Sequence, residues 1–330
     1  SEGFKNPVIF GGNTSGTFTS STFDSNSNRI VIAYRDASTG YGYAVVGTVN
    51  PANNSISFGS AAVFNSASTD LVTSTFDSNS NKVVICFSQG GGKAIVATVS
   101  GTSISFGTEV AFEAAASAFI SPTFDSSANK VVIGYQDSGN SSYGTAIVGT
   151  ISGTNISFGT AVVFNAATTN AVVTTFDTNA NKVVIGFGDN GNSVRGTAVV
   201  GTVSGTNISF GTAVVFHTGD TNEIHTTFDS TANKVIFTYR DTTESQKGKA
   251  IVGTVSGTGI SFGSEATYAN AATTNYQVVL YNSDSNKTLI VYPSGVSPYY
   301  TVAVVGTISG TNISFGTSVN IETTSGANDA

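Results

Sequence analysis

The 330-residue sequence has one cysteine, two histidines and five prolines, and it contains neither tryptophan nor methionine. A single cysteine excludes a disulfide framework and a cysteine-based zinc site. Only 10% of the residues are charged, the formal net charge is −7, and no basic run occurs, so we expect no nucleic acid partner. No apolar stretch approaches the roughly 20 residues that a membrane helix needs, so we expect no membrane insertion.

The main feature of the sequence is internal repetition. The triplet Thr-Phe-Asp begins at residues 22, 75, 123, 175 and 227, and Leu280-Tyr281-Asn282 is a degenerate sixth copy. A second marker, Ser-Phe-Gly, places phenylalanine at positions 58, 106, 158, 210, 262 and 315. Both markers recur about every 52 residues, so six copies of one unit fill most of the chain.

Each repeat is predicted to form four short strands, which we name a to d. In the fourth copy they are predicted at 172–176, 182–187, 197–203 and 208–216, all rich in Val, Ile, Thr and Phe. Turn-forming residues separate them, and no segment shows capped helical periodicity. Six antiparallel meanders of this length predict an all-β fold, a six-bladed β-propeller of four-stranded antiparallel blades. We expect Phe23, Phe58 and their equivalents to fill the space between blades. A β-solenoid is the alternative, although its coils are usually shorter.

The expected domain is a single propeller over residues 1–321, followed by a short polar tail at 322–330. The repeats span roughly 11–64, 65–112, 113–164, 165–216, 217–268 and 269–321. Residues 7–10 form an extra segment, because Val8-Ile9-Phe10 aligns with the outer half of strand d. Seven such segments for six blades leave one terminus free to pair with a neighbour, so a homo-oligomer through the termini is conceivable.

Sequence variation among the repeats is confined to two of the four connections. The a–b turns (Asp-x-Asn-x-Asn) and c–d turns (Ser-Gly-Thr-x) are nearly constant, whereas the b–c and d–a connections differ from copy to copy. In a meander these two variable connections emerge on the same side. We therefore expect the b–c/d–a loop face to be the recognition surface.

Two sets of side chains near this face are candidate ligand-binding residues. An acid recurs two positions after the strand b aromatic, at Asp36, Asp137, Asp189 and Asp241. These carboxylates could bind a cation or sugar hydroxyls, but capping of the strand end is the preferred interpretation. Tyrosines gather in the variable segments, at Tyr41, Tyr43, Tyr143, Tyr299 and Tyr300. They could stack on a sugar or anchor a protein, or simply cover the sheet ends.

The a–b turns resemble the start of a calcium loop, but they lack its glycine hinge and distant glutamate. We interpret Asp24, Asp77, Asp177 and their neighbours as backbone-bonding turn residues, and we predict no metal and no cofactor. Catalysis is poorly supported, because both histidines lie in one copy and no Gly-x-Ser-x-Gly elbow occurs. The four arginines, at 29, 35, 195 and 240, are interpreted as occupying unlike positions. No catalytic residue is predicted, although paired carboxylates stay open as an alternative.

The repeat sequence, represented by residues 75–85, 198–206 and 208–216, resembles repeats in virion proteins of marine tailed phages, including fibre, tail and decoration proteins. The likeness covers residues from about 7 to 321 and concerns repeat style, so it transfers no functional residue. It implies a structural or host-binding role on a particle, at a virion surface or otherwise outside the cell. The expected partners are other virion proteins or a host-surface glycan.

The leading interpretation is therefore a non-enzymatic virion module that binds a glycan or another virion protein through the b–c/d–a loop face. A free or secreted multivalent lectin is the alternative. A glycan-cleaving enzyme is the third.

Overall fold

The computed structural model describes residues 8–10, 16–273, 275–297 and 299–321. The predicted tail at 322–330 lies outside these residues. Two compact units are distinguished: the first comprises residues 1–140, 146–161 and 205–207, and the second comprises 141–145, 162–204 and 208–330. The described residues form antiparallel β-sheets with two single-turn 3-10 helices and no helix long and apolar enough to cross a lipid bilayer.

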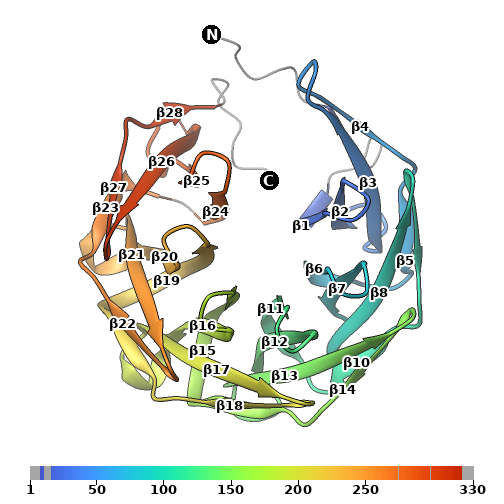
Figure 1. The fold of residues 1–330 in the computed structure, drawn as a ribbon, viewed down its shortest axis with the longest axis horizontal. Coiled ribbons are helices and arrows are strands. Elements are labelled where there is room, and N and C mark those ends of the chain that lie inside the picture. The colour runs from blue at the N-terminus through green and yellow to red at the C-terminus, as the bar shows by residue number, and fades with distance from the viewer. Residues whose placement is uncertain (1–7, 11–15, 274, 298, 322–330) are drawn as a thin grey trace. The chain divides into compact units, whose positions relative to one another are not determined.

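The strands follow the repeat. The first unit contains β1 (Gly16–Asp24), β2 (Arg29–Asp36), β3 (Gly42–Asn50), β4 (Ser55–Phe58), β5 (Ala62–Asn65), β6 (Asp70–Asp77), β7 (Lys82–Ser88), β8 (Gly92–Ser100), β9 (Ser103–Phe106), β10 (Val110–Glu113), β11 (Ser117–Asp125), β12 (Lys130–Asp137), most of β13 (Tyr143–Ser152), and β14 (Asn155–Phe158). Figure 1 shows each meander of this unit with its strands side by side.

The second unit continues the pattern. It contains β15 (Val162–Asp177), β16 (Lys182–Asp189), η1 (Asn190–Asn192), β17 (Arg195–Ser204), nearly all of β18 (Asn207–Phe210), β19 (Val214–Asp229), β20 (Lys234–Asp241), η2 (Thr242–Glu244), β21 (Lys247–Ser256), β22 (Gly259–Phe262), β23 (Ala266–Ala272), β24 (Val278–Asn282), β25 (Lys287–Pro293), β26 (Thr301–Ser309), β27 (Asn312–Phe315) and β28 (Val319–Asn320).

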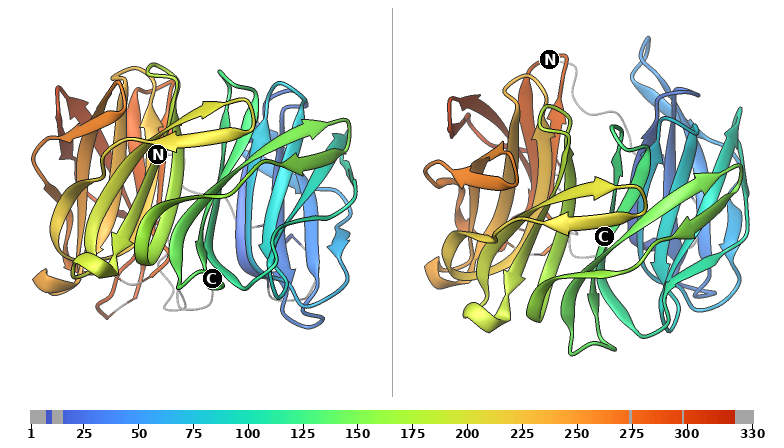
Figure 2. Two further views of the ribbon diagram at one scale, coloured as in Figure 1. Left: turned by 90° about the horizontal axis from the view of Figure 1, so that it is seen from below. Right: turned by 60° about the horizontal axis from the view of Figure 1, so that its bottom comes forward.

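The sequence-predicted fold class, a six-bladed β-propeller, is confirmed. Strands a, b and c of a repeat pair in order, as β6, β7 and β8 do, and strand d returns along strand c. Figure 2 shows hairpin turns closing these strands at both ends within each unit.

Strand d differs from the prediction. It is broken into two pieces, such as β9 and β10, which pair with opposite ends of the same strand c. The break follows Ser-Phe-Gly, where a Cβ on Gly107 would lie 1.8 Å from the carbonyl oxygen of Thr154 in the next blade's c–d turn. Gly211 meets Thr258 in the same way, at 1.9 Å. The near-constant sequence on this side of each blade is therefore a steric fit between neighbouring blades.

The predicted d–a loops also differ, because β19 runs without interruption from the outer half of strand d through the following strand a. In this repeat the connection is therefore extended backbone. Polar residues in it had suggested a loop, but they pair with the adjacent strands.

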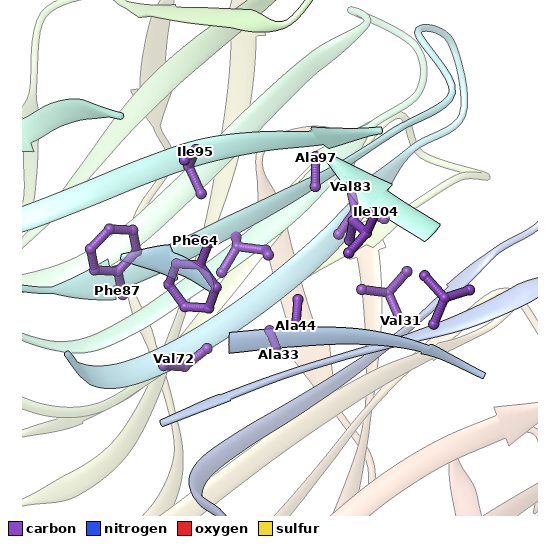
Figure 3. Packing of buried hydrophobic residues seen from close by; sticks show 12 residues of the cluster. Val31, Ala33, Ala44, Phe64, Val72, Val83, Phe87, Ile95, Ala97 and Ile104 are labelled. Carbon is purple, nitrogen blue, oxygen red and sulfur yellow. The ribbon is translucent and has the colours of Figure 1, made fainter. Parts of the chain in front are cut away.

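The core lies between successive blades of a unit. Phe64 of one blade packs its ring 5.2 Å from Phe87 and 6.0 Å from Phe106 of the next, measured between ring centroids. Figure 3 shows Phe64 beside Phe87 within a cluster of buried Val, Ile and Ala side chains. Equivalent contacts recur at Phe112, Phe164, Phe216 and Tyr268.

The predicted filling role is thus correct for the Ser-Phe-Gly phenylalanines but wrong for Phe23, whose side chain is 55% exposed. The prediction is correct for its equivalents Phe76, Phe124 and Phe228, which pack against the buried clusters. The outer-strand phenylalanine also fills this space. Phe10 repeats it at the N-terminal side, with its ring centroid 5.3 Å from that of Tyr34 and 5.9 Å from that of Phe58. This contact supports the alignment of Val8-Ile9-Phe10 with the outer half of strand d.

Candidate functional site

Four of the six b–c connections share one backbone hydrogen bond although their sequences differ. The amide of a buried threonine that opens the next strand a donates to a carbonyl in the b–c loop: Thr69 to Gly40 (2.9 Å), Thr169 to Ser142 (3.0 Å), Thr221 to Val194 (2.9 Å) and Thr273 to Gln246 (2.9 Å). All four acceptor residues have positive φ. A fixed loop backbone with changing side chains is what a set of related binding surfaces requires.

The four predicted strand-end aspartates form Asx turns within these loops. Asp36 accepts from the amides of Ser38 (2.8 Å) and Thr39 (2.9 Å), and Asp137 accepts from those of Gly139 and Asn140. Asp189 and Asp241 cap η1 and η2 in the same manner. The capping interpretation is therefore confirmed, and a ligand-binding role of these carboxylates stays a prediction.

The structure separates the predicted tyrosines into different environments. Tyr41, Tyr143 and Tyr300 share one position, just before strand c, and Tyr41 is exposed. Tyr43 lies on strand c, partly buried, and stacks on Tyr34 with a centroid distance of 5.9 Å. Tyr299 is exposed, whereas Tyr300 packs partly against the core. Tyr41, Tyr143 and Tyr299 are thus the best placed of the five to meet a ligand.

The a–b turns, at the opposite ends of the strands, use their aspartates for backbone hydrogen bonds. Asp77 accepts from the amides of Asn79 (2.8 Å) and Ser80 (2.9 Å), and Asn81 closes the turn with φ +55°. The turn interpretation is confirmed for this motif. In the described ranges, no three His, Cys, Asp or Glu side chains form a group that could hold a metal ion.

Sequence reasoning missed a charged cluster in the second unit, at the junction of the fourth and fifth blades. Its centre is Lys249, whose Nζ lies 2.8 Å from Asp241 Oδ2, 2.7 Å from Glu244 Oε1 and 3.5 Å from Glu265 Oε2. His217, on the outer strand of the fourth blade, places Nδ1 2.6 Å from Glu265 Oε1 and Nε2 3.3 Å from Asp241 Oδ2.

Burial makes these contacts strong. Asp241 is fully buried and Lys249 is 6% exposed. Burial alone raises the pKa of Asp241, but hydrogen bonds from Lys249 and Thr243, with the nearby charges of His217 and Lys249, outweigh it and hold that pKa well below its ordinary range. For Lys249, burial lowers the pKa, yet hydrogen bonds to Asp241 and Glu244 raise it well above its usual value. Glu244 and Glu265 still reach solvent, so their carboxylates can accept hydrogen bonds from ligand hydroxyls.

The sequence indicates this cluster only through a lysine and a glutamate that occur together, at equivalent positions, in two of the repeats. Lys249 with Glu265 in the fifth copy has a counterpart in Lys93 with Glu109 in the second, and the structure joins Lys93 to Glu109 by an ion pair. The other copies carry neither charge at these two positions.

The prediction that all four arginines occupy unlike positions is wrong. Arg35 and Arg240 both stand between the strand b tyrosine and the strand-end aspartate, as Tyr-Arg-Asp. Each reaches the start of strand a in the next blade: Arg35 Nη1 donates to Asp70 Oδ1 (2.7 Å), and Arg240 Nη1 donates to Asn275 Oδ1 (2.6 Å). Spacing from the strand b aromatic would have revealed the equivalence.

His225 gives the second unit a pH-dependent stability. It lies on strand a, where other copies have Ser, Thr or Val, and burial lowers its pKa to about 4. Between about pH 6.5 and pH 4 the unfolded chain binds a proton that the folded chain does not, so stability falls as the pH falls through this window. Because the ring keeps partial solvent contact, we expect a loss of about 1–3 kcal/mol.

Chemical denaturation at pH 7 and pH 4.5 of the wild type and of His225→Thr measures this effect. The variant, which has the threonine found at Thr73 in the second copy, should show a smaller decrease. An equal decrease in both proteins would contradict the assignment to His225.

Comparisons with known proteins identify the fold. No protein-family model matches the chain, and no curated protein matches it by sequence. Among solved structures it is similar to the BP39L lectin from Burkholderia pseudomallei, with a TM-score of 0.67 and 12% identity over 93% of this chain and 85% of that one. It is also similar to AofleA from Arthrobotrys oligospora (TM-score 0.55, 9% identity, 93% and 88% covered). A third similar structure is a protein of unknown function from Dyadobacter fermentans DSM 18053 (TM-score 0.59, 11% identity, 90% and 96% covered).

These similarities place the chain in a structural class, a propeller architecture that includes a lectin, and at 9–12% identity they concern the fold alone. None of them links the chain to phage virion proteins.

Proposed function

We propose that this protein is a non-enzymatic, multivalent glycan-binding module that uses the b–c/d–a loop face. The observation that carries the proposal is the backbone hydrogen bond that four of the b–c loops share: a threonine amide of the next blade ties each of these four loops, beneath side chains that differ from copy to copy. One rigid frame repeated around a propeller provides several related sites, whose weak individual affinities combine on a surface rich in ligand.

The chemistry of this face suits carbohydrate. Exposed tyrosines such as Tyr41 and Tyr299 offer ring faces to the apolar side of a sugar, and their hydroxyls stay available for hydrogen bonds. Glu244 and Glu265 offer carboxylate acceptors, which bind hydroxyls strongly when ionised. The similar fold of a lectin supports the same class of ligand.

The non-enzymatic part of the proposal rests on the ion pairs and the shifted pKa values of side chains in the charged cluster. In the charged cluster, Lys249 and His217 both face carboxylates, and Tyr239 has a pKa raised far above its normal value by burial and by the charge of Glu265. Lys249 is held protonated in ion pairs and Tyr239 is held in its neutral form, so both are poor nucleophiles or bases near neutral pH.

The proposed setting is extracellular, with a cell-surface glycan as the partner. The resemblance of the repeat to virion arrays is the observation that favours a phage particle as the carrier. Purification of the chain with phage particles would support that setting, and secretion as a free protein would support the lectin alternative.

A glycan array probed with the purified full chain tests the function. We expect selective binding to a subset of glycans and at least a tenfold loss of apparent affinity in the Tyr41→Ala/Tyr143→Ala variant, because avidity multiplies the loss of single sites. The Asn155→Ala/Asn207→Ala variant, changed in exposed c–d turns of the other end, is the matched control and should bind normally. Loss of binding in the control with retention in the tyrosine variant would overturn the placement of the site.

A further inference from the structure

Every repeat carries a residue of positive φ at the same position, and in five of the six repeats this residue forms a bulge in strand a. Six residues before the a–b turn Asp or Asn, a non-glycine residue adopts positive φ: Phe18 (48°), Leu71 (53°), Phe119 (50°), Ala171 (48°), Glu223 (51°) and Tyr276 (73°). In the first five copies the register of strand a against strand b shifts at this residue. This left-handed conformation is unfavourable for an L-residue, and such strain concentrates at functional positions.

The bulge redirects one side chain to solvent. Phe18, Phe119 and Tyr276 are 43%, 41% and 71% exposed, whereas the residue after the bulge is buried in most copies, as Val72 and Ile120 are. Re-aiming a side chain is the usual effect of a bulge. The position therefore presents an exposed aromatic ring in three copies, whereas Leu71 and Ala171 pack against the buried clusters at the same position.

In each unit, one exposed aromatic bulge residue directly follows a residue that a blade-bridging arginine meets, by strand pairing in the first unit and by a hydrogen bond in the second. In the first unit, Arg35 pairs in register with Thr17, which precedes Phe18, and its guanidinium binds Asp70. In the second unit, Arg240 binds the side chain of Asn275, which precedes Tyr276. Each junction thus combines an exposed aromatic residue, an arginine and the acceptor that the arginine binds. Phe18 belongs to the same blade as Arg35, whereas Tyr276 belongs to the blade after that of Arg240.

We propose that these two junctions, Phe18/Arg35/Asp70 and Tyr276/Arg240/Asn275, are pyranose-binding subsites. The ring of Phe18 or Tyr276 stacks on the face of the sugar, and the guanidinium with its acceptor partner binds vicinal hydroxyls. Each guanidinium uses one Nη1 hydrogen in its bridge and retains other donors for the ligand. The bridge also fixes the guanidinium in place before the sugar arrives, which reduces the entropy lost on binding.

This inference rests on the proposed glycan-binding function and adds where two of the subsites lie. Arg35 is joined to a carboxylate and Arg240 to an amide. The two acceptors differ in charge, so the two subsites should prefer different hydroxyl arrangements.

The test uses the full chain with methyl glycosides of mannose, galactose, glucose and fucose, and counts bound ligands by native mass spectrometry and calorimetry. Phe18→Ala and Tyr276→Ala should each remove one bound ligand, and the double variant should remove two and lower retention on a glycan surface at least tenfold. Tyr276→Phe, which keeps the ring, should retain its ligand.

Phe119→Ala is the matched control. Phe119 has the same strained backbone and similar exposure, but Gln136 replaces the arginine opposite it, so its removal should leave the stoichiometry unchanged. Thermal unfolding of all variants verifies that they remain folded. Wild-type stoichiometry in a folded double variant would overturn this inference alone, whereas a wild-type protein that binds no glycan on the array would overturn the proposed function with it.

Discussion

Replacing Lys249 by methionine should lower the free energy of unfolding by about 3–5 kcal/mol, because it removes the one cation at the centre of a buried carboxylate cluster. Asp241 is fully buried and takes its closest ion pair from Lys249 at 2.8 Å, and Glu265 faces the same ammonium group. Methionine preserves most of the side-chain volume, so the loss measures the uncompensated charge and leaves little cavity.

The matched control is Lys247→Met. Lys247 lies two residues earlier on the same strand, is partly exposed, and pairs only with Glu244, at 3.3 Å, in the described part of the chain. Solvent screens such a pair, so the expected loss is below about 1 kcal/mol. Guanidinium denaturation of both variants at pH 7 gives the comparison, and losses of equal size would show that the cluster is not the stabilising element described above.

Gly107→Ala should destabilise the first unit by about 3 kcal/mol, since the new methyl group would overlap the backbone of the adjacent blade. Its Cβ would stand 1.8 Å from the carbonyl oxygen of Thr154, and no side-chain rotation can relieve a clash with backbone. The two blades must separate locally to admit the methyl group.

Gly101→Ala separates this effect from a general loss of glycine. Gly101 lies in a c–d turn with φ +63°, and its Cβ would meet nothing within 4 Å. Only the left-handed conformation penalises alanine there, at about 1 kcal/mol. Thermal and chemical unfolding should therefore show that Gly107→Ala is clearly less stable than Gly101→Ala. The reverse order would contradict the steric fit described above for the near-constant sequence of the c–d turns.

Much of the architecture follows from local sequence. Thr-Phe-Asp and the Asp-x-Asn-x-Asn turn predict a hairpin at the observed place, because Asp77 binds amides two and three residues away and Asn81 tolerates positive φ. The repeat period then predicts the number of blades. These features depend on contacts within a few residues, which sequence displays directly.

The missed features depend on the neighbouring blade. Gly107 admits no side chain because the next blade's turn approaches it, a contact 47 positions away that no local window reveals. The bulge at Phe18 was unpredictable, since phenylalanine ordinarily avoids positive φ. The charged cluster joins His217 to Asp241 and Glu265 across a blade junction. The Arg35 and Arg240 equivalence, by contrast, was present in Tyr-Arg-Asp and only needed alignment on the preceding tyrosine.

The central claim of the proposed function is that one chain carries several carbohydrate sites on its repeated blades. Native mass spectrometry of the full chain, titrated with the simplest glycan that an array identifies, tests it most directly. The account predicts successive bound states with more than one ligand per chain, and a product spectrum that contains intact glycan only. A chain that stays unliganded through the titration, or one that releases cleaved sugar, would contradict it.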